Sequence, residues 1–340
     1  MPLGDPPRNV PRSGINTGVL AAYAQTINPK DPLAGLVVGE RPEPTAPNDQ
    51  WTTIQVRAAA LNHHDIWSLR GVGLPAERLP MILGCDAAGV DQDGNEVIVH
   101  SLIGDEQWRG DESLDPGRTL LSERHQGTLA QRLTVPIRNL VPKPRELSFE
   151  QAACLPTAWL TAYRMLFTRG RLTPGRTVLV QGSSGGVTTA LIVLASHAGM
   201  RVWATGRSQA KRDLALALGA DAAFEPGARL PERVDAVLET TGAATWSHSV
   251  KALKPGGTII ICGTTTGDAT PAELTRIFYL QLSVVGSTMG TREELERLMR
   301  FIVERKIEPT IAAVLPLQQA RRGFEAMLCG ETHGKIVFTV

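Results

Sequence analysis

The sequence predicts an α/β protein that combines a doubly wound parallel sheet with a compact, mainly β domain. Strands and helices alternate through the middle of the chain, which is typical of a parallel sheet covered on both faces. Short β-prone runs separated by Pro and Gly clusters fill residues 19–143, and they indicate a partly antiparallel β domain. The stretch 176–195 is the clearest local signal and marks where the parallel sheet begins.

Residues 176–195 read RTVLVQGSSGGVTTALIVLA and predict a strand, a glycine-rich turn and a helix. The apolar run 178–180 is short enough for a strand buried on both faces. Gly182, Gly185 and Gly186 permit a tight turn, and from Val187 onward apolar residues recur at helical spacing. Turn amides and a helix N-terminus that point to one place stabilise an anion such as a pyrophosphate.

A second strand and helix follow this turn, at Arg201–Thr205 and Gln209–Leu218. Strand, helix and strand within roughly thirty residues form a βαβ unit. A lone glycine-rich turn is a weak signal, but inside such a unit it indicates a nucleotide-binding site.

Further elements are expected on both sides of this unit. Before residue 143 the expected strands are Val19–Tyr23, Thr52–Ala58, Glu96–His100 and Leu129–Pro136. A short helix is expected at Asn62–Arg70, with Asn62 near its N-cap. The polar segment Gly104–Glu123 should be a surface loop that Trp108 pins to the body.

In the second half, Ser148 and Gln151 form a capping pattern that opens a helical region through Phe167. The other expected elements are a strand at 234–238, a helix at 246–253, a turn at 254–257, a strand at 258–262, an apolar run at 278–287, a helix at 292–304 and a strand in the closing GKIVFTV. The helix at 292–304 shows apolar residues at helical spacing.

Composition excludes several classes of protein. The formal net charge is +1, which gives no reason to expect a nucleic-acid or membrane partner, and no apolar stretch is long enough to cross a bilayer. The four cysteines are far apart and form no CxxC pair, which favours reduced thiols in a cytoplasmic protein. Residues 1–18 lack an apolar core, so we expect an N-terminal extension rather than a secretory signal.

Several ordered motifs carry a likeness to a known family over nearly the whole chain after Val19. They are LNHHDIWSLRG at 61–71, LPMILGCDAAGV at 79–90, GTLAQRLTVPIRNLVPKP at 127–144, VLVQGSSGGV at 178–187, ALGAD at 217–221, KPGGTII at 254–260 and the closing GKIVF. On these motifs the chain resembles the medium-chain dehydrogenase/reductase superfamily, and within it the zinc-independent, quinone oxidoreductase-like branch.

The resemblance implies two domains. A GroES-like, mainly β substrate domain would comprise residues 19–146 and 287–340, and a Rossmann cofactor domain would comprise residues 147–286. Nicotinamide and substrate would meet in the cleft between them.

Zinc-dependent members of this superfamily carry a Cys, then a Gly-His-Glu triplet, then a second Cys as catalytic ligands. The matching positions here are Asn62, Cys85 with Asp86, and Thr157. An amide and a hydroxyl are poor zinc ligands beside thiolate and imidazole, so we expect no metal. Thr188 replaces the usual third glycine of the Rossmann turn, where it should push helix and strand slightly apart, while its hydroxyl could contact a phosphate.

The corner after the second strand bears on the choice between NAD and NADP. NAD-selective enzymes usually carry Asp or Glu there, whereas this corner reads Thr205, Gly206, Arg207, Ser208, with Lys211 just after. No carboxylate repels a 2′-phosphate, and Arg207 and Lys211 supply positive charge. NADP(H) is the expected cofactor; a basic helix start that faces solvent is the alternative. The residues expected to bind NADP(H) are Ser184, Gly185, Gly186, Val187, Thr205, Arg207, Ser208, Lys211, Thr241, Gly263, Thr264 and Thr265.

By resemblance, the expected catalytic residues are Asn62, Asp65 and Thr157, and the expected substrate-pocket residues are His64, Trp67 and Cys85. Asn62 could orient a substrate carbonyl, and an ion pair between Asp65 and Arg70 is the structural alternative for Asp65. Core packing is the alternative for Trp67 and Cys85.

Together these observations predict an NADPH-dependent oxidoreductase that transfers hydride to a quinone or an activated alkene, an enone or enal, without zinc. One alternative is a zinc-dependent alcohol dehydrogenase whose ligands have shifted to Cys85, Asp86, Cys154 or His64. Another is a non-catalytic NADPH-binding protein. The apolar run Phe278–Val285 near the sheet edge predicts a homodimer, because an exposed apolar edge needs a cover.

Overall fold

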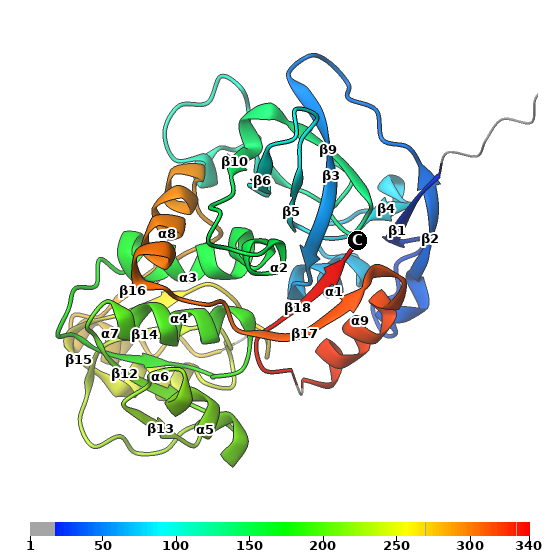
Figure 1. Ribbon diagram of the computed structural model, residues 1–340. Coiled ribbons are helices and arrows are strands. Elements are labelled where there is room, and N and C mark those ends of the chain that lie inside the picture. The colour runs from blue at the N-terminus through cyan, green and yellow to red at the C-terminus, as the bar shows by residue number, and fades with distance from the viewer. Residues whose placement is uncertain (1–17, 269, 331) are drawn as a thin grey trace, which may run out of the picture.

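The computed structural model describes residues 18–268, 270–330 and 332–340. A doubly wound parallel sheet with its helices forms one lobe, and a mainly β lobe lies beside it (Figure 1). This is the α/β fold that the sequence predicts. The expected N-terminal extension, residues 1–18, lies outside the described residues except for Gly18, the first residue of β1. Within the described ranges, no helix combines the length and the apolar character needed to cross a membrane.

The parallel sheet has the strand order β13-β12-β11-β14-β15-β16, which is the Rossmann arrangement of two halves around a central strand. Its strands are β11 (Thr177–Val180), β12 (Arg201–Thr205), β13 (Ala222–Phe224), β14 (Val234–Glu239), β15 (Leu253–Ile261) and β16 (Ser283–Gly286). Every neighbouring pair in this order is parallel.

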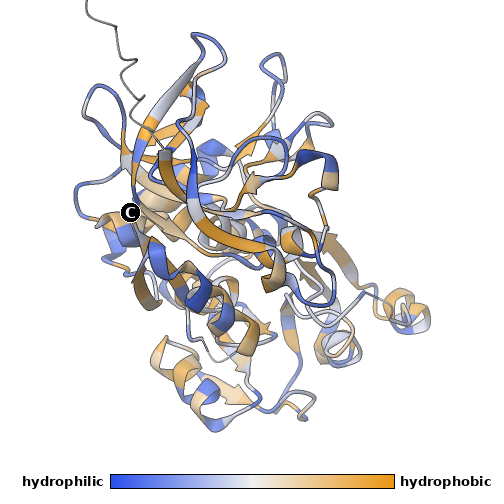
Figure 2. Ribbon diagram, turned by 90° about the vertical axis from the view of Figure 1, so that its right-hand side faces the viewer, coloured by the Kyte–Doolittle hydropathy of each residue, from blue (hydrophilic) through white to orange (hydrophobic). Residues whose placement is uncertain are grey.

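Helices cover both faces of this sheet. Val178 and Val180 of β11 pack in one apolar cluster with α4 (Gly186–His197), whereas Leu179 packs in another with α6 (Trp246–Ala252). Because successive side chains of a strand point to opposite faces, these two clusters lie on the two sides of the sheet. Helix α5 (Gln209–Ala217) joins the α4 side. Figure 2 shows hydrophobic residues concentrated along the strands and hydrophilic residues along the loops.

The helical region before the sheet begins as predicted. Helix α2 (Phe149–Ala153) follows Ser148, whose hydroxyl accepts from the Gln151 N–H at 3.1 Å, while the Gln151 side chain accepts from the Ser148 N–H at 3.0 Å. Wider helical turns at Leu155–Trp159 and Arg164–Arg169 flank α3 (Leu160–Tyr163). Helix α8 (Arg292–Arg305) packs against α3.

Both parts of the chain outside the Rossmann sheet build the β lobe. Its main sheet has the order β10-β6-β5-β3-β18-β17, with β9 also paired to β3, and a smaller sheet has the order β2-β1-β4. The early strands are β1 (Gly18–Ala24), β2 (Leu36–Pro42), β3 (Trp51–Ala60), β4 (Met81–Ile82), β5 (Asp86–Val90), β6 (Glu96–Val99), β9 (Arg132–Pro136) and β10 (Leu140–Pro142).

The C-terminal segment returns to this lobe. Strand β17 (Ile311–Pro316) and helix α9 (Ala320–Cys329) precede β18 (Lys335–Thr339), which pairs antiparallel with β3. The exact boundaries between the GroES-like and the Rossmann domain, at 146/147 and 286/287, stay a proposal.

Two local expectations differ from the structure. The turn expected at 254–257 is part of β15, which runs from Leu253 to Ile261 with a register shift against β14. The apolar run 278–287 is divided between the end of α7 (Leu274–Tyr279) and β16. The Pro and Gly residues at 254–257 do not by themselves distinguish a turn from a strand. The apolar run 278–287 likewise does not distinguish a helix from a strand.

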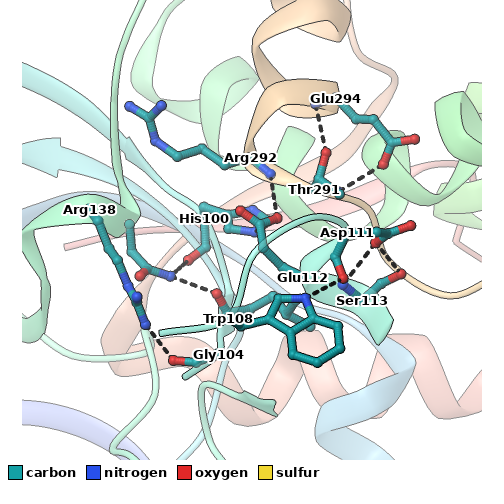
Figure 3. Close-up of polar contacts among 12 residues, drawn as sticks. His100, Gly104, Trp108, Asp111, Glu112, Ser113, Arg138, Thr291, Arg292 and Glu294 are labelled. Atoms are coloured by element: carbon teal, nitrogen blue, oxygen red, sulfur yellow. Dashed lines mark hydrogen bonds and ion pairs between the residues drawn. The ribbon is translucent and has the colours of Figure 1, made fainter. Parts of the chain in front are cut away.

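The polar segment 104–123 is a loop, apart from the short strand β8 (Thr119–Leu120) and a helical turn at Glu112–Leu114, but Trp108 does not pin it. The Trp108 indole N–H donates to the carbonyl of Asp111 within the same loop at 3.0 Å, and the ring is more than a third exposed. Charged groups anchor the loop instead: Glu112 accepts the backbone N–H of Arg292 at 2.9 Å, as Figure 3 shows. The prediction for Trp108 is therefore wrong.

Candidate active site

The carboxyl ends of four parallel strands meet at one edge of the Rossmann sheet, and the predicted cofactor residues lie there. The turns that follow β11 and β12 occupy residues 181–185 and 206–208, and the loops that follow β14 and β15 include residues 240–245 and 262–267. The last two loops touch, because a Cβ added to Gly242 would stand 2.9 Å from the Thr264 Cα. Ligands bind at this edge in open α/β sheets, and it brings together Thr241, Gly263, Thr264 and Thr265.

The glycine-rich turn is braced from the neighbouring strand. Gly182 has a φ of +94°, and its N–H donates to the Thr205 hydroxyl at 2.9 Å. The same hydroxyl donates to the Gln181 carboxamide at 3.0 Å. Thr205 is buried, so it supports the turn rather than facing a ligand.

Gly185 and Gly186 lie at the start of α4 but differ in what surrounds them. Gly185 is exposed, and an added Cβ would meet no atom closer than 3.6 Å. At Gly186 an added Cβ would stand 2.8 Å from the Lys335 Cδ. Gly186 is therefore required by protein packing, whereas Gly185 leaves open space at a helix N-terminus, where an anion is stabilised.

Ser184 and Val187 flank these two glycines and are both half-buried. The Thr188 hydroxyl donates to the Gly185 carbonyl at 3.0 Å. It is thus engaged in the first turn of α4, so the expected contact between this hydroxyl and a phosphate has no support here.

The corner after β12 carries the expected positive charge. Arg207 is exposed, and Ser208 caps α5 by accepting the Lys211 N–H at 3.4 Å. The Lys211 ammonium donates to the Gly330 carbonyl at 2.8 Å. Residues 205–212 contain no carboxylate.

A buried carboxylate supports the loop after β14. Glu239, at the end of that strand, accepts the N–H groups of Thr241 and Gly242 at 2.8 and 3.1 Å, and the hydroxyls of Thr245 and Ser249 at 2.8 and 2.5 Å. These four donors satisfy the hydrogen-bonding capacity of the Glu239 carboxylate, which is fully buried. Glu239 is not among the residues that the sequence predicts for the site, although an acidic residue at the end of an apolar strand is a usable signal.

In the β lobe, three side chains from distant segments form a second cluster. Lys335 donates from Nζ to the Leu61 carbonyl at 2.8 Å, to Asn62 Oδ1 at 2.5 Å and to Asp86 Oδ2 at 3.0 Å. Asn62 Nδ2 donates to the same Asp86 oxygen at 2.8 Å and to the Ala60 carbonyl at 3.3 Å. Both amide hydrogens of Asn62 are thus engaged inside the protein, which leaves none for a substrate oxygen in this conformation. Lys335 lies in the closing GKIVF motif but is not among the residues that the sequence predicts for the site.

Asp65 has a structural environment. It lies in α1 (His63–Leu69), is fully buried, and accepts the N–H groups of Asn62 at 2.9 Å and Gly84 at 2.7 Å. Burial raises the pKa of Asp65, against the opposing effect of these hydrogen bonds. The alternative partner, Arg70, lies instead over the Trp67 ring at 5.2 Å from its centroid.

The expected pocket residues take different positions. His64 Nε2 lies 3.9 Å from Glu123 Oε1, and Trp67 is half-buried under the Arg70 guanidinium. Cys85 is fully buried, and its thiol donates to the Leu121 carbonyl at 3.3 Å. Burial and the nearby Asp65 and Asp86 raise the pKa of Cys85 well above its ordinary value, so it is a neutral thiol at pH 7.

Thr157 lies in the wider helical turn Leu155–Trp159, next to Ala158. Ala158 in turn contacts the Gly186 position, because a Cβ added there would stand 3.2 Å from the Ala158 Cβ. The Thr157 hydroxyl is buried and has no hydrogen-bond partner among the described residues. It is therefore a polar group close to the start of α4 that the protein itself leaves unsatisfied.

The residues present do not fit a catalytic zinc ion. The one carboxylate at the matching positions, Asp86, is already paired with a cation, Lys335. Of the other candidate ligands, Cys85 donates from its thiol to the Leu121 carbonyl and Cys154 to the Glu150 carbonyl, each at 3.3 Å. Across residues 18–268, 270–330 and 332–340, no group of three or more His, Cys, Asp or Glu side chains is placed to hold a metal.

The sheet edge does fit a dinucleotide. Gly185 offers open space at the N-terminus of α4, and Arg207 supplies an exposed cation two residues beyond β12. Donor groups at a helix N-terminus suit a pyrophosphate, and a guanidinium suits a phosphate on the ribose.

Comparison with known proteins identifies the family. The description "Alcohol dehydrogenase GroES-like domain" matches residues 48–145, and "Zinc-binding dehydrogenase" matches residues 186–304. A solved structure titled as an NAD-dependent alcohol dehydrogenase is 32% identical, covers 94% of this chain and 99% of its own, and superposes with a TM-score of 0.86. The chain belongs to the medium-chain dehydrogenase/reductase superfamily.

Members of this superfamily are oxidoreductases that use NAD(H) or NADP(H). This chain has the GroES-like domain and the Rossmann domain of the family. Two curated members of the superfamily are similar over most of their length. The crotonyl-CoA carboxylase/reductase of Cereibacter sphaeroides is 28% identical over 77% of this chain and 74% of its own. The acryloyl-coenzyme A reductase of Metallosphaera sedula is 28% identical over 84% of this chain and 91% of its own.

Proposed function

We propose that this medium-chain dehydrogenase/reductase is an NADPH-dependent reductase of activated alkenes that works without zinc. Its substrates would be α,β-unsaturated carbonyl compounds: enones, enals or enoyl thioesters, with quinones as a further class of acceptor. The observation that carries the proposal is that Asn62 and Asp86, at positions that match the ligand motifs of metal-dependent members, are engaged with each other and with Lys335.

The corner after β12 supports NADP(H) as the cofactor. Arg207 is exposed there, and no carboxylate in residues 205–212 would repel a 2′-phosphate. Gly185 would admit the pyrophosphate, and the loop around Thr241, held by Glu239, would meet the rest of the cofactor. When bound, the nicotinamide supplies a hydride.

The chain's own residues would hold the negative charge that develops on the acceptor oxygen. In an enone or a quinone this charge is delocalised onto an oxygen, which one or two hydrogen-bond donors can stabilise. Asn62 has both amide hydrogens engaged, so we assign the direct contact to the unsatisfied hydroxyl of Thr157. The β-carbon of the alkene would receive the hydride, and a proton from water would go to the α-carbon, so that the carbonyl compound gains the two electrons and NADPH would be the reductant.

Simple alcohol oxidation is the second candidate, because the solved structure at 32% identity is titled as an alcohol dehydrogenase. That reaction needs a group to hold an alkoxide, which zinc provides in metal-dependent enzymes. The cluster around Lys335 does not fit such an ion. The names of the two curated relatives, an acryloyl-CoA and a crotonyl-CoA reductase, support alkene reduction.

We also propose a homodimer in the cytoplasm. Cys85, Cys154, Cys262 and Cys329 are all free thiols, which supports a reducing compartment. The dimer would cover the apolar surface of α7 and β16.

The test is a substrate panel with the purified protein and both cofactors. NADPH oxidation with a small enone, an enoyl-CoA thioester or a 1,4-quinone should exceed oxidation of primary alcohols with NADP⁺ by at least ~100-fold, about 2.7 kcal/mol in barrier. Faster turnover of alcohols, or stoichiometric zinc that is lost together with activity on chelation, would contradict the proposal.

A further inference from the structure

A chain of buried hydrogen bonds runs beneath the carboxyl edge of the Rossmann sheet, and the proposed chemistry does not use it. Its centre is Gln181, the first residue after β11, which is fully buried. The Gln181 side chain accepts from the Thr205 hydroxyl at 3.0 Å and donates to the Ser249 hydroxyl at 3.0 Å. Since Thr205 ends β12 and Ser249 lies in α6, this one amide joins β12 to the helix that follows β14.

A histidine fixes the orientation of the Gln181 amide. His248 Nε2 lies 2.9 Å from the Ala228 carbonyl, which can only accept, so this nitrogen carries the hydrogen. In the neutral ring His248 Nδ1, 3.0 Å from Gln181 Nε2, is then an acceptor. Gln181 Nε2 therefore donates one hydrogen to His248 and the other to Ser249, and the Gln181 carboxamide oxygen faces Thr205.

The chain ends at two loops of the candidate cofactor site. On one side, the Thr205 hydroxyl accepts the Gly182 N–H at 2.9 Å, within the glycine-rich turn. On the other side, the Ser249 hydroxyl donates to Glu239 Oε2 at 2.5 Å, and Glu239 Oε1 accepts the Thr241 N–H at 2.8 Å. Each link pairs one donor with one acceptor, so the chain is continuous from the turn after β11 to the loop after β14.

Every link of this chain is buried. Gln181, Glu239 and Ser249 are fully buried, and Thr205 is 2% exposed. A hydrogen bond is electrostatically stronger inside a protein than in water, and a buried polar group that loses its partner is costly. A shift of either loop would break a link and leave such a group unpaired. The shape of the turn and the shape of the loop are therefore tied to each other.

We propose that Gln181 and Ser249 are positioning residues that couple the two halves of the dinucleotide site. They act through Gly182, in the turn that would admit the pyrophosphate, and through Thr241, in the loop that would meet the rest of the cofactor. Holding both loops in place before binding lowers the free-energy cost of ordering them when NADP(H) binds. The inference rests on the proposed function only through its cofactor site, and it holds for any hydride acceptor.

Two hydroxyl groups that donate to the same carboxylate provide a matched pair of variants. Ser249 connects Glu239 to Gln181, whereas Thr245 donates to Glu239 Oε1 at 2.8 Å from outside the chain. Ser249→Ala should weaken NADPH binding by ~10-fold because it opens the chain, and Thr245→Ala should weaken it by less than ~3-fold. Isothermal titration calorimetry with NADPH, in the absence of any acceptor, measures both dissociation constants. Equal effects of the two variants would overturn the inference, since the loss of any donor to Glu239 would then suffice.

A double-variant cycle tests the coupling itself. Thr205→Val opens the chain on the side of the turn, and Ser249→Ala opens it on the side of the loop. If both act through one chain, the combined variant should bind NADPH about as weakly as either single variant, ~10-fold below the wild type rather than ~100-fold below. Effects that multiply would reveal two independent local supports and would overturn the coupling.

Gln181→Met covers the case in which Ser249→Ala or Thr205→Val does not fold. It removes the centre of the chain and keeps the bond between Ser249 and Glu239, and it should also weaken NADPH binding by ~10-fold. Urea unfolding of each variant separates stability from binding. A Gln181→Met protein that is less stable but keeps the NADPH dissociation constant within ~3-fold of the wild type would show a structural role alone and overturn the inference.

These outcomes are separable from failure of the proposed function. A protein that shows this coupling in NADPH binding but turns over alcohols rather than enones or quinones would contradict the function and leave the positioning role intact. A protein that reduces enones with NADPH, and whose Ser249→Ala and Thr245→Ala variants bind NADPH equally well, would overturn only the present inference.

Discussion

The ammonium group of Lys211 donates a hydrogen bond to the backbone carbonyl of Gly330 at 2.8 Å, although 119 residues separate them. Gly330 ends helix α9, where carbonyl groups lack helical partners and carry partial negative charge. Lys211 therefore joins the corner after β12 to the C-terminal segment. Arg207, by contrast, is exposed at the same corner. The two cations that the sequence predicts for the 2′-phosphate are thus not equivalent.

The first prediction concerns cofactor choice. Arg207→Ala should weaken NADPH binding by about 1–3 kcal/mol and leave NADH binding nearly unchanged, because only NADPH carries the phosphate that a guanidinium would pair with. Lys211→Ala should have a smaller effect, since its ammonium already holds Gly330. Dissociation constants for both cofactors, measured by fluorescence titration, decide this. Arg322→Ala, an exposed arginine on α9, is the control. Equal wild-type affinity for NADPH and NADH would contradict the assignment.

The second prediction separates the two glycines at the start of α4. Gly185 has φ −75° and ψ 163°, which alanine adopts readily, and its surroundings are open. Gly185→Ala should therefore keep the stability within about 0.5 kcal/mol but weaken NADPH by at least ~10-fold, about 1.4 kcal/mol, because the methyl group enters the space for the pyrophosphate. Gly186→Ala should cost about 1–3 kcal/mol of stability through overlap with Lys335. Denaturant unfolding and cofactor titration of both variants test this pair, and an unstable Gly185→Ala would refute the distinction.

Local patterns explain why the fold could be predicted. The capping box of Ser148 and Gln151, strand β12 and helix α8 each depend on residues within a few positions of one another. Lys335 could not be found this way, because its partners Asn62 and Asp86 lie 273 and 249 residues earlier. The pairing of β18 with β3, together with that of β3 with β5, brings them together.

The same limit applies to individual roles within the candidate site. The sequence predicts a short helix at Asn62–Arg70 with Asn62 near its N-cap, and the structure has α1 at His63–Leu69 with Asn62 as the N-cap. It does not reveal that the Asn62 side chain turns toward Asp86 and Lys335, or that the Thr157 hydroxyl finds no partner among the described residues. Side-chain direction at such positions is decided by burial and by partners from other segments, which spacing alone does not contain.

The third prediction concerns assembly. Strand β16 is an edge strand, and α7 beside it exposes large apolar side chains: Leu274 and Phe278 are each 70% exposed, and Tyr279 is 77% exposed. Apolar surface of this kind on an unpaired edge favours pairing with a second copy. Light scattering should report a homodimer at micromolar concentration, and Phe278→Glu should shift it toward monomer. Leu328→Glu, at an exposed apolar residue on α9, is the matched control. A monomeric wild type would refute the prediction.

The fourth prediction concerns acid stability. Arg164 is buried and pairs with Asp111 of the polar loop and, at 2.7 Å, with Glu294 of α8. Although burial acts to raise the pKa of Asp111, hydrogen bonds from Ser113 and Arg164 together with the Arg164 charge hold it below its ordinary value of 3.8. The stability from this pair is therefore fully present above pH 3.8 and is lost as the pH falls through the lower, folded-state pKa.

Arg164→Met should cost about 3–5 kcal/mol at pH 7, because it leaves Glu294 buried without a cation. Asp111→Asn should cost less and should make the unfolding free energy less dependent on pH in the acid range. Urea unfolding between neutral pH and pH 3 measures both effects. An Asp111→Asn protein whose stability falls with acid as steeply as that of the wild type would contradict this account.

The fifth prediction concerns the reaction. The buried Thr157 hydroxyl has no hydrogen-bond partner in the part of the chain that the structure describes, and two accounts of this hydroxyl make opposite predictions. If it donates to the developing oxyanion, Thr157→Val should lower kcat with an enone by ~100- to 1000-fold while leaving the NADPH dissociation constant within about threefold, and Thr157→Ser should keep most of the turnover. If it is only an unsatisfied core hydroxyl, Thr157→Val should stabilise the fold, because a buried unpaired group is removed, and kcat should not change.

Steady-state kinetics and thermal unfolding of the wild type, Thr157→Val and Thr157→Ser separate these accounts. Unchanged turnover in Thr157→Val would remove the proposed oxyanion donor and leave the cofactor site intact.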